Sequence, residues 1–219
     1  MATKNKYFTE DDLARISAAV KAAESKTSGE IVPFFVPQSD DYEEATWRGA
    51  VMFGALPLAI LAFLRLFSDY WLATSALRII LLFFSTSILG ALLVRFIPRM
   101  RCFFAGKDLL QHRVSLRASR AFVSEEVFKT RDRTGILIFL SFMERIVVVL
   151  GDSGINAKVQ QSDWDGIVQT IVGGMKTKQP AEGLIRAIGQ CGELLQKHGV
   201  ARKSDDSDEL SDQLRIKDK

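Results

Sequence analysis

The sequence predicts an α+β fold in which a small mixed sheet packs against helices and is interrupted by a two-helix transmembrane hairpin. Two uncharged apolar runs, 49–64 and 79–94, form the centre of the chain. One β-rich apolar segment precedes them at 30–36, and two follow at 135–140 and 145–150. Because only a short connection joins the last two segments, they must pair as an antiparallel hairpin.

The composition suits one compact domain with a separate apolar block. The chain has 219 residues, 47% hydrophobic and 25% charged, with a net charge of +3. Most charges lie outside the central block, and the roughly 170 residues around it suffice for a single core. Cys102 and Cys191 lie far apart, and neither His112 nor His198 stands at metal-ligand spacing, which argues against a zinc site. We expect free structural thiols.

The segment before the apolar block predicts one helix and one strand. Thr9 is a suitable N-cap with Asp12 three residues later, and apolar residues then recur at helical spacing. The polar, acidic start lacks the pattern of a secretory signal. Residues 30–36 form a buried strand, and Pro33 places this strand toward an edge or a bulge of the sheet.

The central block predicts two membrane spans. Each uncharged run is 16 residues long. That is slightly fewer than the ~20 that cross a bilayer core, and the flanking residues supply the rest. Neither run shows a polar face, which argues against a helical hairpin buried in a soluble protein. Trp47, Tyr70 and Trp71 suit an interfacial aromatic belt, with a short polar turn at 67–71. The expected boundaries are 1–46, a hairpin at 47–98, 99–199, and a disordered charged tail at 200–219.

Basic residues predict the orientation of this hairpin. They gather at its outer flanks, as Arg48, Arg95, Arg99, Arg101, Lys107 and Arg113, whereas its tip carries Arg65 and Arg78. By the positive-inside rule, the soluble domain and both termini are cytoplasmic, in an inner or plasma membrane. Since Arg95, Arg99 and Arg101 directly follow a span, we expect contact with anionic lipid headgroups and no binding of nucleic acid.

The remaining elements follow from periodicity and turn residues. An amphipathic helix is expected at 107–130 and a turn at 131–135. After the two strands, 151–154 forms a turn, Asp163 caps a helix through 167–172, and Pro180 begins the last helix.

Several segments, in this order and spacing, resemble the TPM domain family. They are 27–31, 133–138, 144–149, 151–155 and 163–168, and the motif residues are Glu30, Glu144, Arg145, Gly151, Gly154 and Trp164. The resemblance covers about 8–36 and 107–199. It implies a compact domain of Rossmann-like appearance, often tethered to a membrane. Members include thylakoid lumen proteins linked to photosystem repair, for which acid phosphatase activity and divalent-cation binding are proposed. Others accompany LemA-type membrane proteins in bacteria. This chain differs from the commoner layout by its internal hairpin.

The candidate chemistry is acidic. Asp40, Asp41 and Asp152 follow predicted strands, and with Asp163 they offer oxygen ligands for Ca²⁺ or Mg²⁺ that would orient a phosphate ester. Simpler interpretations stand beside this one: Asp152 as a turn former, Asp163 as a helix cap, and 40–44 as a solvated acidic run. Glu144 and Arg145 then form a surface ion pair of little energetic weight.

Three functions of different class remain open, and no catalytic residue is identified. We favour a membrane-anchored interaction module that helps to assemble a membrane protein complex, because no serine–histidine pair or phosphate-binding glycine loop is present. The alternative is a weak metal-dependent acid phosphatase. A channel or transporter ranks below both, because the polar groups within the spans are few, chiefly 85–87.

Overall fold

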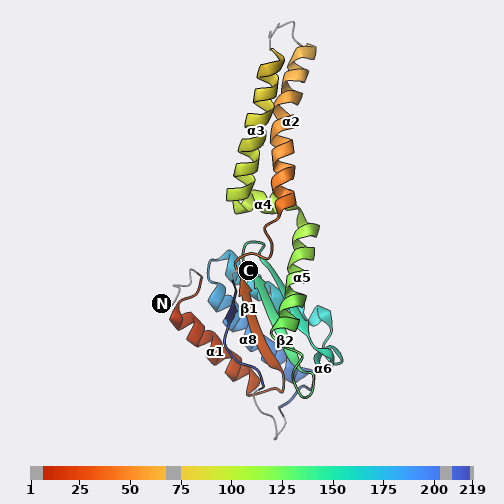
Figure 1. Ribbon diagram of the computed structural model, residues 1–219. Helices are drawn as coiled ribbons and strands as arrows, with labels where there is room; N and C mark the ends of the chain where they lie inside the picture. Colours follow the sequence, from red (N-terminus) through yellow and green to blue (C-terminus); the bar gives the residue numbers. More distant parts are fainter. Residues whose placement is uncertain (1–6, 68–74, 203–208, 218–219) are drawn as a thin grey trace. The chain divides into compact units, whose positions relative to one another are not determined.

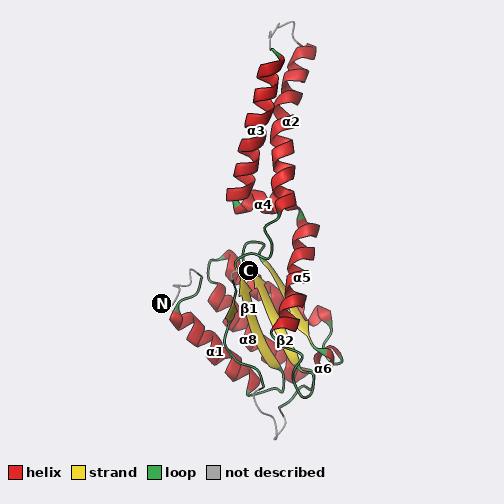
Figure 2. Cartoon of the chain, viewed as in Figure 1, coloured by secondary structure: helices red, strands yellow, loops and turns green. Residues whose placement is uncertain are grey.

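The computed structural model describes residues 7–67, 75–202 and 209–217 and shows a mixed α+β fold (Figures 1 and 2). The chain divides into two compact units. We call residues up to Ser39 together with those from His112 the α+β unit, and Asp40–Gln111 the hairpin unit. The predicted turn residues Tyr70 and Trp71 lie outside the described ranges.

The first two elements agree with their sequence signals. Helix α1 spans Glu10–Glu24, and the hydroxyl of Thr9 accepts the Asp12 amide while the Asp12 carboxylate accepts the Thr9 amide. This reciprocal capping box satisfies two amides that a helix start leaves open. Strand β1 covers Glu30–Val36, and every one of its residues is buried.

The sheet is mixed, with strand order β3-β2-β1-β4 (Figure 2). Strand β2, Gly135–Ser141, runs parallel to β1 from the pair Glu30–Gly135 to the pair Val36–Ser141. Strand β3, Ile146–Gly151, is antiparallel to β2. The predicted α+β class and the predicted hairpin of the last two strands are therefore confirmed.

Side chains alternate between two apolar cores on the two faces of the sheet. One core joins Phe35 and Ile138 to α1, to α7 (Asp165–Lys176) and to α8 (Pro180–Lys197). The other joins Phe34 and Phe139 to α5 (Lys107–Ser124). Two short helices, α6 (Ser153–Asn156) and η1 (Gln161–Trp164), connect β3 to α7. Helices thus cover both faces, as expected when parallel strands are joined by a crossover.

Helix α5 ends earlier than the predicted residue 130. Glu126 adopts a positive φ of 55°, which a right-handed helix does not allow, and the Val127 amide donates to Phe122 O. This reversal lets Val127 turn back and become fully buried in the α5-side core. Tertiary packing here overrides a continuous helical pattern.

Pro33 has no backbone N–H, and it occupies a position of β1 that does not have to donate a hydrogen bond to β2. The Glu30 amide donates to Thr134 O, and Val36 O accepts the Phe142 amide, so even-numbered residues of β1 bond toward β2. Pro33 therefore faces the other edge. Strand β4, Arg215–Ile216, pairs there only from Phe34 onward. The expected edge character of Pro33 is confirmed at its own position.

The described part of the carboxy-terminal tail contains a strand, although the sequence predicted disorder for 200–219. Beyond 203–208, which lie outside the described residues, residues 209–217 follow the sheet and supply β4. Leu210, Leu214 and Ile216 pack against the two cores. Glu125 pairs with Arg215 at 3.6 Å and with Lys217. This charged tail contains three apolar residues, and they are enough to attach a short strand to the open edge of β1.

Three further helices lie within the described part of the hairpin unit. They are α2 (Glu43–Phe67), α3 (Ala76–Phe96) and α4 (Pro98–Ala105). Helices α2 and α3 pack along each other, and α4 contacts both (Figure 1). The hairpin unit begins and ends several residues outside the predicted 47–98.

Candidate functional site

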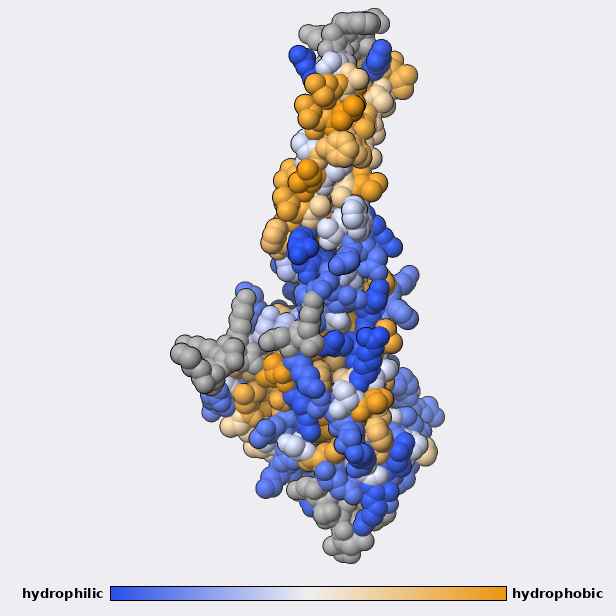
Figure 3. Space-filling model, viewed as in Figure 1, coloured by the Kyte–Doolittle hydropathy of each residue, from blue (hydrophilic) through white to orange (hydrophobic). Residues whose placement is uncertain are grey.

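The hairpin presents apolar side chains outward along almost its whole length. Helices α2 and α3 contain 25 and 21 residues and are long and apolar enough to cross a membrane. At 1.5 Å per residue each spans about 30 Å or more, the thickness of a bilayer core. Exposed members include Val51, Leu56, Ile60, Phe63, Leu81, Phe84, Ile88 and Leu92. Figure 3 shows this apolar surface over the hairpin, with hydrophilic surface at both of its ends. In a soluble protein a helix pair of this kind would be buried.

Small residues hold α2 against α3. A Cβ added to Gly90 would lie 2.5 Å from Phe53 Cβ, and one added to Gly54 would lie 2.1 Å from Ser87 Oγ. The predicted close approach at these glycines is confirmed. Between neighbouring helices in lipid, such packing replaces the hydrophobic driving force that water would supply.

Two of the three hydroxyls at 85–87 bond within their own helix, whereas Ser87 Oγ is buried and has no hydrogen-bond partner among the described residues. The hydroxyls of Ser85 and Thr86 donate to Leu82 O of their own helix, at 3.0 and 2.7 Å. Such back-bonding satisfies a hydroxyl in an apolar environment. Nothing in these two contacts favours a transport pathway.

Asp152 caps a helix and forms an ion pair. Its Oδ1 accepts the Ser153 amide at 2.6 Å, and its Oδ2 lies 2.8 Å from Nε of Arg133. The Asp152 side chain is buried whereas that of Arg133 is half-exposed. The structure therefore supports a capping and pairing role, and the partner Arg133 was not anticipated from sequence.

Asp163 is not the N-cap of the following helix, as the sequence suggested. It is the third residue of η1, and its carboxylate accepts the Gln160 amide at 2.9 Å. Its Oδ2 also lies 3.8 Å from Nε2 of His198. The capping function is real but applies to the short helix one turn earlier.

Glu144 is buried, so the expectation of a surface ion pair with Arg145 is wrong. Its Oε1 accepts the Ser39 amide at 2.9 Å, and its Oε2 accepts the Ser141 hydroxyl at 2.6 Å. The hydroxyls of Ser39 and Ser141 are 2.7 Å apart. Arg145 is exposed, with a φ of 54°. The buried carboxylate thus fastens the chain where it leaves β1, and neither serine was identified from the sequence.

The other motif residues shape the opposite end of the sheet, where β1 and β2 begin. The buried carboxylate of Glu30 accepts the amides of Glu209 and Leu210. A Cβ on Gly154 would lie 2.4 Å from Asp132 O, so only glycine allows this approach. Gly151 ends β3, and Trp164 is buried in the core beside α7 and α8.

Asp152 and Ser39, the residue before Asp40, lie at opposite ends of the sheet. Asp152 follows β3 and its amide donates to Gly135 O, at the end of the sheet where β1 begins. Ser39, directly before Asp40, follows the end where β1 finishes. Because β3 is antiparallel, its carboxyl end does not meet that of β1. In the hairpin unit, the Asp41 amide donates to Asp40 Oδ1 at 2.6 Å. Among the described residues, no group of three or more acidic, histidine or cysteine side chains is placed to hold a metal ion.

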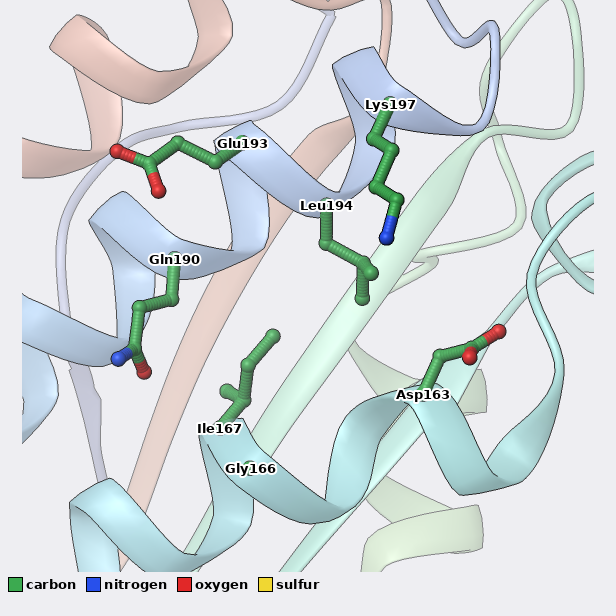
Figure 4. Close-up of a pocket in the computed structure, with 7 residues that line it drawn as sticks. All are labelled: Asp163, Gly166, Ile167, Gln190, Glu193, Leu194 and Lys197. Atoms are coloured by element: carbon green, nitrogen blue, oxygen red, sulfur yellow. The ribbon is translucent and has the colours of Figure 1, made fainter.

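A shallow groove of about 280 Å³ separates α7 and α8 (Figure 4). Ile167 and Leu194 face each other in its middle, and Lys197 points into it (Figure 4). The carboxylates of Asp163 and Glu193 point away from each other at opposite sides (Figure 4). These charges do not converge on one point, so the groove lacks the arrangement of a small-molecule site.

Comparison with known proteins identifies a similar fold. No protein-family model matches the sequence, and no curated protein matches it. Among solved structures, the NMR structure of the BA42 protein from the psychrophilic bacterium Bizionia argentinensis is similar, with a TM-score of 0.59. The two sequences are 20% identical, and the match covers 99% of this chain and 100% of the other. At this identity the likeness concerns the fold.

Proposed function

We propose that this chain is a membrane-anchored interaction module that helps to assemble or stabilise a membrane protein complex. The observation that carries the proposal is the exposed apolar surface of α2 and α3. The α+β unit has its own two cores, so that surface is not needed for its folding. A helix pair with such a surface is stable in lipid, and the folded unit joined to it is suited to binding partners.

Charge supports an orientation with both termini in the cytoplasm. The flanks of the hairpin carry Arg48, Arg95, Arg99 and Arg101, against Arg65 and Arg78 near the tip. The resemblance to the TPM domain family supports a location in the inner or plasma membrane of a bacterium. The same resemblance supports partners among other membrane proteins, including LemA-type proteins.

The anchor is tested by extraction and by protease access. We expect the full chain to remain in the membrane fraction after alkaline carbonate washing, and a variant with 47–98 replaced by a soluble linker to be released. In right-side-out vesicles, protease should leave an epitope at the carboxyl terminus intact. Release of the full chain contradicts the anchor, and cleavage of the epitope reverses the orientation.

The interaction role is tested separately, by cross-linking in intact membranes and recovery in mild detergent. A chimera that carries an unrelated two-span hairpin is the matched control, because it anchors the same α+β unit. Specific membrane proteins recovered with the full chain support the proposal. Recovery of this chain alone, under conditions that retain a known complex, contradicts it.

The alternative proposal is a weak phosphatase that uses Ca²⁺ or Mg²⁺ at Asp40, Asp41, Asp152 and Asp163, and it rests on the family resemblance. An NMR titration with either ion, on the chain in which a short linker replaces 47–98, would show shifts confined to these residues. Hydrolysis of a generic phosphate ester that is unchanged in Asp152→Ala contradicts this assignment.

A further inference from the structure

Helix α4 has two different faces. On the inner face, Phe104 lies 6.3 Å from the ring of Phe53 in α2, and Ala105 is buried. On the outer face, Phe103 is 74% exposed, whereas its neighbour Phe104 is partly buried. Arg99 stands four residues before Phe103, on the same side of the helix, and is also exposed.

Arg48 fastens α4 across the base of the hairpin. Its guanidinium donates to Phe104 O and Ala105 O, each at 3.1 Å. These are carbonyls at the carboxyl end of α4, where a helix leaves acceptors open and where a cation is favoured by the dipole. Figure 1 shows α4 lying transverse to α2 and α3, which it contacts. A helix that lies across the base of two spans lies near the membrane surface.

Aromatic and basic side chains surround this transverse helix. Trp47 and Phe96 are each 73% exposed, and Ile97 is 39% exposed. From Ala76 to Lys107 the chain has basic residues but no acidic one. In the described part of the hairpin unit, the acidic residues are confined to 40–44 and Asp108. Exposed aromatic rings beside arginines are the usual composition of a membrane–water interface.

We propose that α4 is an interfacial helix that lies in the headgroup layer, with Phe103 at the acyl boundary and Arg95 and Arg99 bound to phosphates of anionic lipids. The inference rests on the proposed membrane anchor and names the lipid class that the base of the anchor recognises. Arg48 is the positioning residue, because its contacts hold α4 transverse. A zwitterionic surface offers the same apolar boundary but no net charge for the arginines.

The depth of α4 is measured in vesicles with the Cys102→Ser, Phe103→Cys chain, which carries a thiol-linked fluorescent label at position 103. Cys191 is buried and does not compete for the label. We expect quenching by nitroxides attached to shallow acyl carbons and protection from aqueous iodide. A label at Val123→Cys, exposed in the α+β unit, is the control and should show the reverse. Iodide quenching at position 103 equal to that at 123 overturns the proposal.

The lipid class is tested with nitroxide-labelled phosphatidylglycerol or phosphatidylcholine, each diluted in the same vesicles. Quenching at position 103 should be stronger with phosphatidylglycerol. Arg95→Gln with Arg99→Gln should lower that preference by about 25-fold, since each basic residue at an anionic surface contributes roughly fivefold. Arg120→Gln with Arg186→Gln, the same charge change in the α+β unit, should leave it unaltered.

The remaining outcomes separate the sources of phosphate and the two proposals. Excess inorganic phosphate should leave the quenching unchanged. If phosphate abolished the quenching, the arginines would be binding a soluble anion and not a lipid. Equal quenching by both lipids also contradicts the proposal. Extraction of the full chain by carbonate rejects the anchor itself. If the chain stays in the membrane but iodide quenches the label at position 103, only the interfacial helix is rejected.

Discussion

Replacement of Glu144 by alanine removes two acceptors from a buried position in the turn between β2 and β3. The two side-chain oxygens of Glu144 accept the Ser39 amide and the Ser141 hydroxyl. Ser141 is fully buried. The substitution therefore leaves two donors without the carboxylate that held them, at the point where the chain departs from β1.

The expected loss of unfolding free energy is about 3 kcal/mol. A hydrogen bond to a charged group contributes about 1.5–3 kcal/mol, and two are removed. Part of this is regained, because the Ser141 hydroxyl can turn to Ser39 Oγ, 2.7 Å away. Glu144→Gln should cost only about 1 kcal/mol, since the amide oxygen still accepts the Ser39 amide and the NH₂ group can donate to Ser141.

The assay uses the buried Trp164 as a reporter of the α+β unit. The chain has three tryptophans, so Trp47→Phe with Trp71→Phe leaves Trp164 alone in the core. Urea unfolding in mild detergent then reports this unit. With a slope of about 2 kcal/mol per molar urea, the midpoint of Glu144→Ala should fall by about 1.5 M.

Two results would refute the reasoning about Glu144. One is an alanine variant whose midpoint equals that of the parent chain, which would mean that solvent replaces the carboxylate without loss. The other is a glutamine variant as unstable as alanine, which would make negative charge, and not hydrogen bonding, the stabilising property. A Ser141→Ala, Glu144→Ala double mutant should be more stable than the sum of the single effects predicts.

Three further predictions concern the α+β unit. Arg145→Gly should raise the unfolding free energy by about 0.5 kcal/mol, because glycine tolerates the φ of 54° at this exposed turn, and a lower thermal midpoint would contradict this. Burial, and secondarily Glu24, raises the pKa of the Cys191 thiol from 9.0 to about 12. Only the unfolded chain ionises this thiol between these values, so stability should fall as pH rises above 9, and less steeply in Cys191→Ala, as followed by urea midpoints. Glu125→Ala should speed hydrogen exchange of the Lys217 amide, which donates to Phe35 O, and unchanged exchange would show that the ion pairs do not hold β4.

The sequence predicted the strongly patterned parts of the fold. Apolar runs identify β1, β2 and β3, and four residues between the last two dictate their antiparallel pairing. The capping box at Thr9 and Asp12 also needed no tertiary information, because its two hydrogen bonds are local. The two long apolar helices of the hairpin are also visible from composition, since no charge interrupts 49–64 or 79–94.

The parts that could not be predicted depend on contacts between distant residues. Glu144 looked like a surface residue because its partner Ser39 is more than a hundred positions earlier in the chain. Asp163 was assigned to the wrong helix, because the 3₁₀ turn before α7 follows no hydrophobic period. The tail was predicted to be disordered from its charge, although pairing with β1 required only two residues. Whether the acidic residues act on a ligand stays a prediction.

The parallel pairing of β1 with β2 has a consequence for synthesis. Each residue of β1 pairs with a partner about a hundred residues further along, beyond the whole hairpin unit. At ~5–20 residues per second, β1 emerges about 5–20 s before β2 can pair with it. During that interval a strand whose seven residues are all buried in the finished protein has no sheet to join. We therefore expect the nascent chain to depend on a chaperone until β2 is complete, with the hairpin emerging before the sheet can close.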